Sequence, residues 1–353
     1  MPGRGRGGTM SDVGREGSAA HRGTAEGRAA ENGKAGRGGT LSRVDAFQKQ
    51  HRWLAIPVAV VRKFGDDNST SLASMIAFWT FFSIFPLLLV FVTLMGIFLP
   101  ASLKASVLTR VAEMFPLLSV STVRGLSGSW WALALGVVTA LWSGLSAVRT
   151  IEQALNSVWE VPQAQRPKFL VKVFRSVWVL AVMGGGLVLS VLINGFVTGA
   201  ATAVNLGWAG HIVGYLISIA LDVALFVAAF RILTAREITT RDVLPGAVLS
   251  GVAFWILESL SSLIISRYLH KAQSTYGHFA TVITILWWFY IQSLVSLFGA
   301  QLNVVLKERL YPRSLTKAPE TDADRRAYQA YASERTYHRR EEVTAEFPPG
   351  HQE

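Results

Sequence analysis

One stretch near the carboxyl end constrains the fold more than any other. Residues 276–306 have the sequence YGHFATVITILWWFYIQSLVSLFGAQLNVVL, and residues 279–298 within them contain no charged side chain. This run is as long as the roughly 20 residues that a helix needs to cross the hydrocarbon core of a bilayer. Its polar and small residues recur at helical spacing and share one face, namely Gln292, Ser296, Gly299 and Asn303. The pattern predicts a transmembrane helix that packs against others.

Further apolar segments of similar length precede this one. Charged residues make up only 16% of the chain, against about a quarter in soluble domains, and they are crowded toward its ends. The sequence therefore predicts an all-α fold, a polytopic membrane helix bundle of about six transmembrane helices with additional interfacial amphipathic helices, within a membrane domain at residues 43–310. The predicted spans cover residues 72–99, 130–148, 177–198, 211–233, 243–266 and 279–306.

Two other segments are amphipathic but too polar to span a membrane. Residues 44–64 interleave apolar and basic residues, which predicts a helix in the membrane interface, bent near Pro57. Residues 101–128 predict a second interfacial helix or a short re-entrant piece. Pro86 lies inside the first span and predicts either an ordinary kink or a hinge. The hydroxyl of Ser83, one turn earlier, is a candidate to bond the carbonyl that the proline frees.

Polar tails flank the membrane domain. Residues 1–42 are basic, rich in Gly and free of aromatic residues, so they cannot bury enough apolar area to order themselves. We expect a disordered, solvated tail there, and the alternative is a basic arm that contacts lipid or RNA. Residues 311–353 are polar with charges of both signs. We expect a solvated tail there too, in which residues 322–343 are able to form a helix.

The loops differ in their content of Lys and Arg. The segments 43–71, 149–176, 231–242 and 307–317 contain 17 of these residues, whereas 100–129, 199–210 and 266–278 contain 5. Because basic loops stay in the cytoplasm, this asymmetry predicts that both termini are cytoplasmic. The net charge of +11 is then accounted for by tails and loops near anionic lipid headgroups, and we predict no nucleic-acid partner.

Ionisable groups inside predicted spans are costly, so each requires a reason. Asp222 lies near the middle of the fourth span and shares a helical face with Ser218, and Glu258 lies in the fifth span. We predict a polar path between the fourth, fifth and sixth spans, lined by Asp222, Glu258 and Gln292. Asn194 of the third span and Ser218 are further candidates. The alternative for each residue is a structural hydrogen bond between helices.

A second candidate group lies at the inner end of the second span. Arg149, Glu152 and Asn156 follow one another at helical spacing. They predict a cytoplasmic gate or a headgroup contact, and the alternative is an ion pair at a helix end. The chain has no Cys, no nucleophile-elbow, zinc-protease or P-loop motif, and no His and Asp cluster with metal-ligand spacing. We therefore predict no enzymatic activity, no metal site and no cofactor.

Three segments resemble the YihY/BrkB family of inner-membrane proteins. They are AFWTFFSIFPLLLV at residues 77–90, residues 149–161 with the Arg166-Pro167 that follows, and residues 276–305. The resemblance covers roughly residues 69–310 and implies a six-helix protein of bacterial cytoplasmic membranes. Gln301 stands where the family is expected to have Glu often, and His278 where a small residue is commoner. Family members have carried a "ribonuclease BN" and a "serum resistance" label, but a nuclease needs a metal or an acid–base cluster in water.

Two hypotheses for the function follow. The first is a carrier or translocase of a lipid-like or small amphipathic substrate, with or without coupling to an ion, that uses the polar path. The second is a membrane scaffold that transports nothing and recruits envelope-building proteins through its tails and interfacial helices. Both hypotheses make membrane lipids partners of the chain, and the sequence indicates no oligomeric state.

Overall fold

Long helices dominate the computed structural model, which describes residues 43, 45–98, 130–166, 178, 207–260, 267, 279–315, 321–338 and 340–347. Within these ranges there is no strand, so the predicted all-α fold is confirmed for the described part of the chain. The predicted span at 177–198, apart from position 178, lies outside the described residues, as do residues 1–42 and 101–128. Five described helices are long and apolar enough to cross a membrane, namely α3 (Ser69–Phe98), α6 (Trp130–Val158), α8 (Gly207–Leu233), α9 (Thr240–Ser259) and α11 (Ala280–Lys307).

These helices begin close to the predicted spans, and one of them is much longer. α6 continues ten residues beyond the predicted end at residue 148, because the amphipathic segment that follows the apolar run remains helical. α3 runs through Pro86. The expectation for Ser83 is wrong, since its Oγ donates to the carbonyl of Thr80 at 2.7 Å. A serine hydroxyl in a helix reaches the carbonyl three or four residues earlier, whereas the carbonyl that Pro86 frees belongs to Phe82.

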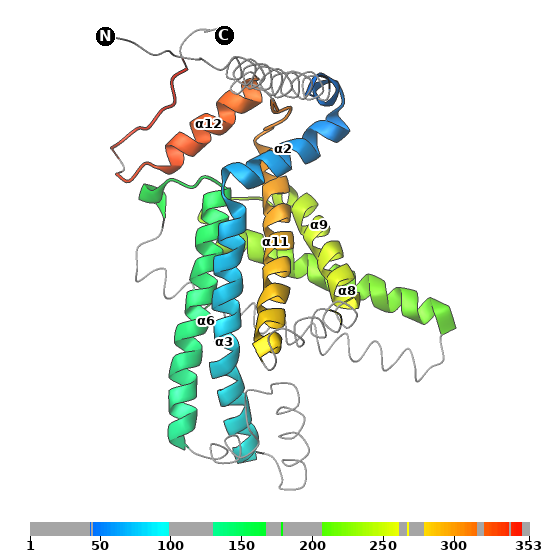
Figure 1. Ribbon diagram of the computed structural model, residues 1–353, viewed down its shortest axis with the longest axis vertical. Helices are drawn as coiled ribbons and strands as arrows, with labels where there is room; N and C mark the ends of the chain where they lie inside the picture. Colours follow the sequence, from blue (N-terminus) through cyan, green and yellow to red (C-terminus); the bar gives the residue numbers. More distant parts are fainter. Residues whose placement is uncertain are drawn as a thin grey trace, which may run out of the picture.

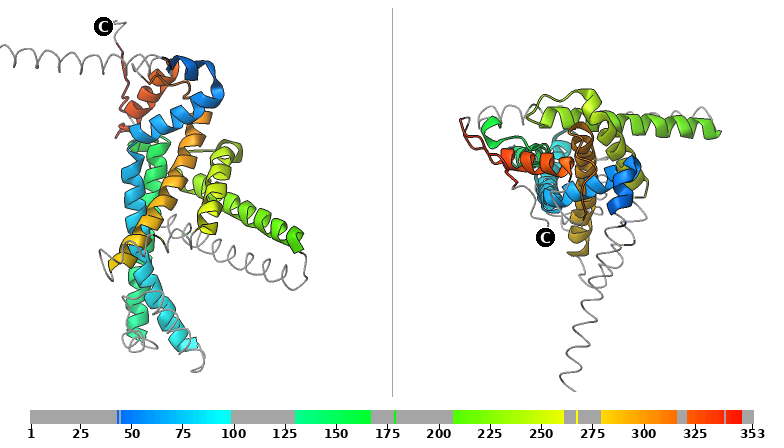
Figure 2. Two further views of the ribbon diagram at one scale, coloured as in Figure 1. Left: turned by 45° about the vertical axis from the view of Figure 1, so that its right-hand side comes forward. Right: turned by 90° about the horizontal axis from the view of Figure 1, so that it is seen from above.

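The helices pack around α11. α3 and α6 run side by side in opposite directions, α11 packs on α3, and α9 packs on both α11 and α8 (Figure 1). α8 lies obliquely to the upright helices, and its N-terminal half projects away from them (Figures 1 and 2). The apolar side chains of Ile212, Val213 and Leu216 are exposed there. A helix with exposed apolar side chains can lie in lipid, because its backbone N–H and C=O groups are hydrogen-bonded within the helix.

Small residues allow α9 and α11 to approach very closely. A Cβ atom added to Gly246 would overlap the carbonyl oxygen of Gly299 on the facing helix. The Oδ1 atom of Asn303 accepts a hydrogen bond from the backbone N–H of Gly246 at 2.6 Å. The Oγ of Ser250 donates to the carbonyl of Val295 at 3.3 Å. The predicted packing role of the Gly299 and Asn303 face is thereby confirmed.

One end of the bundle is rich in polar and charged side chains, and we call it the polar end. It contains α2 (Arg52–Asp66), the short helix η1 (Gln163–Gln165), α12 (Asp322–Glu334) and the adjoining ends of α6, α8 and α11 (Figure 1). α2 packs on α11, where Phe64 stacks on Phe298 with ring centroids 4.0 Å apart. The predicted interfacial helix is interrupted at His51, whose backbone is extended, and α2 then runs through Pro57 without ending.

α12 corrects the expectation of a solvated carboxyl tail. Thr321 caps the helix by accepting from the backbone N–H of Asp324, which completes a capping box. Ala323, Asp324 and Ala327 are buried. The helix ends at Glu334, and residues 341–347 are not helical. The tail is part of the fold because its small-residue face packs against the body and Asp324 pairs with a buried arginine.

Candidate functional site

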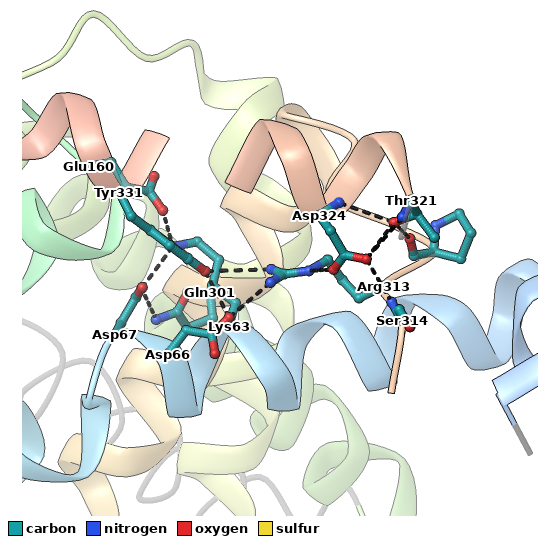
Figure 3. A network of polar contacts seen from close by, with 11 residues as sticks. Lys63, Asp66, Asp67, Glu160, Gln301, Arg313, Ser314, Thr321, Asp324 and Tyr331 are labelled. Atoms are coloured by element: carbon teal, nitrogen blue, oxygen red, sulfur yellow. Dashed lines mark hydrogen bonds and ion pairs between the residues drawn. The ribbon is translucent and has the colours of Figure 1, made fainter. Parts of the chain in front are cut away.

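A buried ionic network lies at the polar end and connects α2, α6, α11 and α12 (Figure 3). At its centre is Lys63, whose side chain is fully buried on the inner face of α2. Its Nζ atom forms an ion pair with Asp67 at 2.7 Å and another with Glu160, just beyond the end of α6. The same ammonium lies 5.3 Å from the centre of the Tyr331 ring on α12. One charge thus holds three separate segments together.

Gln301 extends this network into α11. Its Nε2 group donates to the Oδ2 atom of Asp67 at 2.7 Å and to the Oγ of Ser69 at 2.9 Å. A glutamate at this position could not donate to Asp67 and would bring a further negative charge beside it. The amide at position 301 therefore suits the surroundings that this chain gives it.

Arg313 fastens α12 to α2. Its guanidinium is fully buried, with Nε 2.7 Å from the Oδ1 atom of Asp324 and Nη2 2.9 Å from the Oδ2 atom of Asp66. The hydroxyl of Tyr331 also donates to Asp66, at 3.2 Å. An arginine suits this position because its planar fork can serve two carboxylates at once. Loss of Arg313 would leave the fully buried carboxylate of Asp324 without a compensating charge.

The network holds more acidic than basic groups. Burial raises the pKa of Glu160 to about 7 even though Lys63 lies beside it. Burial also raises the pKa of Asp67 above its usual value. For Lys63, burial lowers the pKa, but the neighbouring carboxylates outweigh this effect and hold the pKa above its usual value. Lys63 therefore stays protonated, and Glu160 takes up a proton near neutral pH.

The predicted gate residues lie beside this network. Asn156 is buried, and its Oδ1 atom accepts a hydrogen bond from the backbone N–H of Ala235 at 2.7 Å. This bond ties the end of α6 to the segment after α8, so Asn156 has a structural role. Glu152 is buried and Arg149 is half-buried, one and two turns earlier on α6. A gating role for these residues stays a prediction.

The two predicted intramembrane carboxylates come from α8 and α9. Asp222 is only 9% exposed, whereas Glu258 is exposed. The carboxylate of Glu258 is near enough to act electrostatically on that of Asp222. Gly251 permits the close approach of the two helices, since a Cβ atom there would lie 2.7 Å from the Cγ2 atom of Val223, the residue after Asp222. The structure thus brings these two carboxylates into one region.

Of the other residues of the predicted path, the structure describes Ser218 and Gln292. Ser218 donates to the carbonyl of Gly214 in its own helix at 3.0 Å. Gln292 is half-buried on α11, and among the described residues no hydrogen bond connects it to Asp222 or Glu258. Asn194 lies outside the described residues.

An open cavity of about 950 Å³ lies beside the half of α8 that leads to the polar end. The guanidinium of Arg231 lines it, with Nε donating to the carbonyl of Ile238 at 3.3 Å and Nη1 donating to the Oγ1 of Thr240 at 2.9 Å. The lining combines apolar residues with polar and charged ones. The apolar residues are Ala224, Val227, Ala228, Ile232 and Ile238, and the polar or charged residues are Arg231, Arg236, Glu237, Thr239 and Thr240.

The chain is similar to known proteins over most of its membrane domain. A family model described as Virulence factor BrkB matches residues 60–324, which include Lys63 and its ion-pair partners Asp67 and Glu160 but not Tyr331. The chain belongs to the BrkB family. This membership confirms the resemblance seen in the sequence, and together with the five apolar helices it makes the chain a membrane protein.

Individual relatives of this BrkB-family protein are 24–26% identical to it. A ribonuclease-like protein called YfkH from Bacillus subtilis is 24% identical over 255 residues, which are 68% of this chain and 90% of the relative. A UPF0761 membrane protein of Alteromonas mediterranea is 24% identical over 271 residues, covering 73% of this chain and 90% of the relative. Another from Pseudomonas aeruginosa is 26% identical over 260 residues, covering 69% and 60%. No solved structure matches the chain.

Proposed function

We propose that this BrkB-family protein is a carrier or translocase that moves an anionic, lipid-like or small amphipathic molecule across the bacterial cytoplasmic membrane. The observation that supports it best is the cavity beside α8, where an apolar helix surface meets Arg231 and Arg236. A substrate with an apolar body and an anionic head has the matching distribution of chemistry. Its body would contact Val227 and Ile232, and its head would accept hydrogen bonds from Arg231.

Asp222 and Glu258 support a coupling role within this proposal. A carboxylate in the middle of a membrane span costs about 2.5–3.5 kcal/mol on insertion scales, so it is kept where it has a task. Asp222 is buried between helices and is influenced by a second carboxylate. We propose that Asp222 exchanges a proton or a cation during transport, with Glu258 as its partner. Gln292, Ser218 and Asn194 remain further candidates for the same path.

The arrangement of the loops supports a cytoplasmic polar end. The described parts of the four loop segments that contain 17 Lys and Arg residues contact one another in pairs there. Lys63 pairs with Glu160, and Arg236 pairs with Glu308 at 3.0 Å. Because basic loops stay on the cytoplasmic side, we propose that both termini are cytoplasmic.

A flux assay on reconstituted vesicles tests the proposal. Protein is inserted into vesicles that contain a fluorescently labelled anionic phospholipid, and membrane-impermeant dithionite then quenches the label in the outer leaflet. We expect wild-type protein to expose inner-leaflet label to dithionite. Arg231→Gln should slow this exposure, whereas Arg241→Gln, an exposed arginine outside the cavity lining, should not. The assay is repeated with several labelled amphiphiles. Transport is refuted if, for each of them, vesicles with wild-type protein lose fluorescence at the same rate as vesicles without protein.

Asp222→Asn separates coupling from transport. If Asp222 exchanges protons, the variant should retain binding but lose the dependence of the rate on a pH gradient. A variant that inserts normally and shows the wild-type dependence on the gradient would eliminate the coupling role.

The alternative function is a scaffold that transports nothing. The ordered polar end favours it, because residues 45–66 and the carboxyl segment present exposed apolar side chains, namely Phe47, Trp53 and Tyr337. Deleting residues 1–40 and 348–353 distinguishes the two functions, since a scaffold should lose partners and a carrier should retain flux. The deletion must spare α12, because Asp324 compensates the buried Arg313. We also propose that the protein is not an enzyme. An assay of the purified protein on RNA tests this proposal, and we expect no cleavage.

A further inference from the structure

A second open cavity lies at the polar end and shares Arg236 with the cavity beside α8. It has a volume of about 510 Å³, within the range of small-molecule sites. We call it the α12 cleft, because Arg325, Arg326 and Gln329 of α12 form one wall. Trp159 and Arg236 form part of the opposite wall.

The α12 cleft has an excess of positive charge. Both acidic groups of its lining are already engaged, since Glu160 pairs with Lys63 and Glu308 pairs with Arg236. Arg326 donates from Nη2 to the carbonyl of Arg309 at 2.7 Å, which is a neutral acceptor. Among the described residues, neither Arg325 nor Arg326 forms an ion pair. Two guanidinium charges on adjacent positions of α12 therefore face this cleft without a carboxylate of their own.

Trp159 of the opposite wall holds a hydrogen-bond donor that is unpaired within the described part of the chain. Trp159 is 1% exposed, and its indole N–H has no hydrogen-bond acceptor among the described residues. Its ring is flanked by the cations of Arg236 and Lys307, 5.9 and 5.7 Å from the ring centre. The indole N–H, like the guanidinium groups, can only donate hydrogen bonds. The cations beside this ring add to the positive charge around the cleft.

A neighbouring cavity shows that the charge is specific to the α12 cleft. That cavity has a similar volume of about 550 Å³ and shares Gln329 and Ser333 with the cleft. It is lined by Glu341 and Glu342 and by no basic residue among those described. The two cavities at α12 thus differ in the sign of their charge, and an anion would enter only the α12 cleft.

We propose that the α12 cleft binds a phosphate-bearing anion, with Arg325 and Arg326 as its principal ligands and Arg236 at its edge. A phosphate group accepts paired hydrogen bonds from guanidinium groups, and two arginines can neutralise its charge. The phosphate belongs either to an anionic lipid headgroup at the membrane surface or to a soluble molecule. The proposal does not rest on the transport function, since none of the α12 residues lines the cavity beside α8.

Two binding experiments on the full chain test this proposal. In the first, inorganic phosphate is titrated by calorimetry into protein held in nanodiscs of zwitterionic phosphatidylcholine. In the second, native mass spectrometry counts the phosphatidylglycerol that stays bound after release from nanodiscs containing this anionic lipid. The test protein carries Arg325→Gln and Arg326→Gln, and the control carries Arg335→Gln and Arg340→Gln. The control has the same change in net charge at residues outside the cleft.

We expect the test protein to bind at least about tenfold more weakly, because charged hydrogen bonds are lost, while the control binds like wild type. A difference with inorganic phosphate assigns the cleft to a soluble phosphate. A difference with phosphatidylglycerol alone assigns it to a headgroup. Gln329→Glu, which adds a carboxylate at an exposed position of the lining, should weaken binding too and leaves the arginines in place. The proposal is overturned if all four proteins bind phosphate and retain phosphatidylglycerol alike.

Discussion

Replacing Lys63 by methionine tests the role of the polar-end network. Methionine fills a similar volume but removes the charge that compensates Asp67 and Glu160. The Lys63 side chain is 0% exposed and the two carboxylates are 5% and 4% exposed, so solvent cannot replace the lost partner. Removal of one member of a buried ion pair costs about 3–5 kcal/mol. For a chain of 353 residues we expect the unfolding temperature to fall by roughly 4–7 °C.

The measurement is a thermal unfolding scan in nanodiscs, followed by tryptophan fluorescence at one scan rate for all proteins. Arg62→Met is the matched control, because Arg62 is the adjacent basic residue of α2 and lies outside the network. This control should change stability by less than about 1 kcal/mol. Adding Glu160→Gln to Lys63→Met should recover part of the loss, since one uncompensated acid is removed. If Lys63→Met unfolds at the same temperature as Arg62→Met, the network does not stabilise the polar end.

Three other predictions follow from the same contacts. Because burial raises the pKa of Glu160 from 4.5 to about 7, the folded state binds this proton more tightly than the unfolded state. The tighter proton binding stabilises the folded state by about 3 kcal/mol below the unfolded pKa, and this contribution is lost as pH rises through about 7. Glu160→Gln removes the titrating group and should therefore flatten the pH dependence of stability in unfolding scans. Gly246→Ala should destabilise the α9–α11 contact by roughly 1–3 kcal/mol or prevent folding, whereas Gly65→Ala, with nothing within 4 Å, should be neutral or gain up to about 1 kcal/mol. Arg313→Lys should release α12, because one ammonium cannot replace the fork that serves two carboxylates, and limited proteolysis should then cut near residue 320; an unchanged digest would contradict the assigned role.

The membrane helices could be predicted from the sequence because their signal is local. An apolar run of sufficient length specifies a span whatever its neighbours are. The helix-packing role of Asn303 could likewise be predicted from its spacing with Gly299, because steps of three or four place residues on one helical face. The sequence placed Asp222 and Glu258 in consecutive spans, and this was the only indication that the two carboxylates lie in one region.

The polar end could not be predicted in the same way, because its contacts join distant parts of the chain. Arg313 and Asp66 are 247 positions apart, and nothing in a polar tail identifies the partner that orders it. One local signal was available, since Lys63 interrupts the apolar face that Val60 and Phe64 form on α2. A charge at such a position indicates a buried partner, although it does not say which one.

The central claim, a site for an anionic amphipathic substrate beside α8, is tested most directly by native mass spectrometry. Wild type, Arg231→Gln and Arg241→Gln are released side by side from nanodiscs made with lipid extracted from bacterial membranes. Folding of each protein is checked beforehand by size-exclusion chromatography. We predict one discrete anionic amphiphile bound to wild type and to Arg241→Gln, and its loss from Arg231→Gln, whose cavity has lost a cationic ligand. The same undifferentiated lipid on all three proteins would contradict the claim and favour the scaffold.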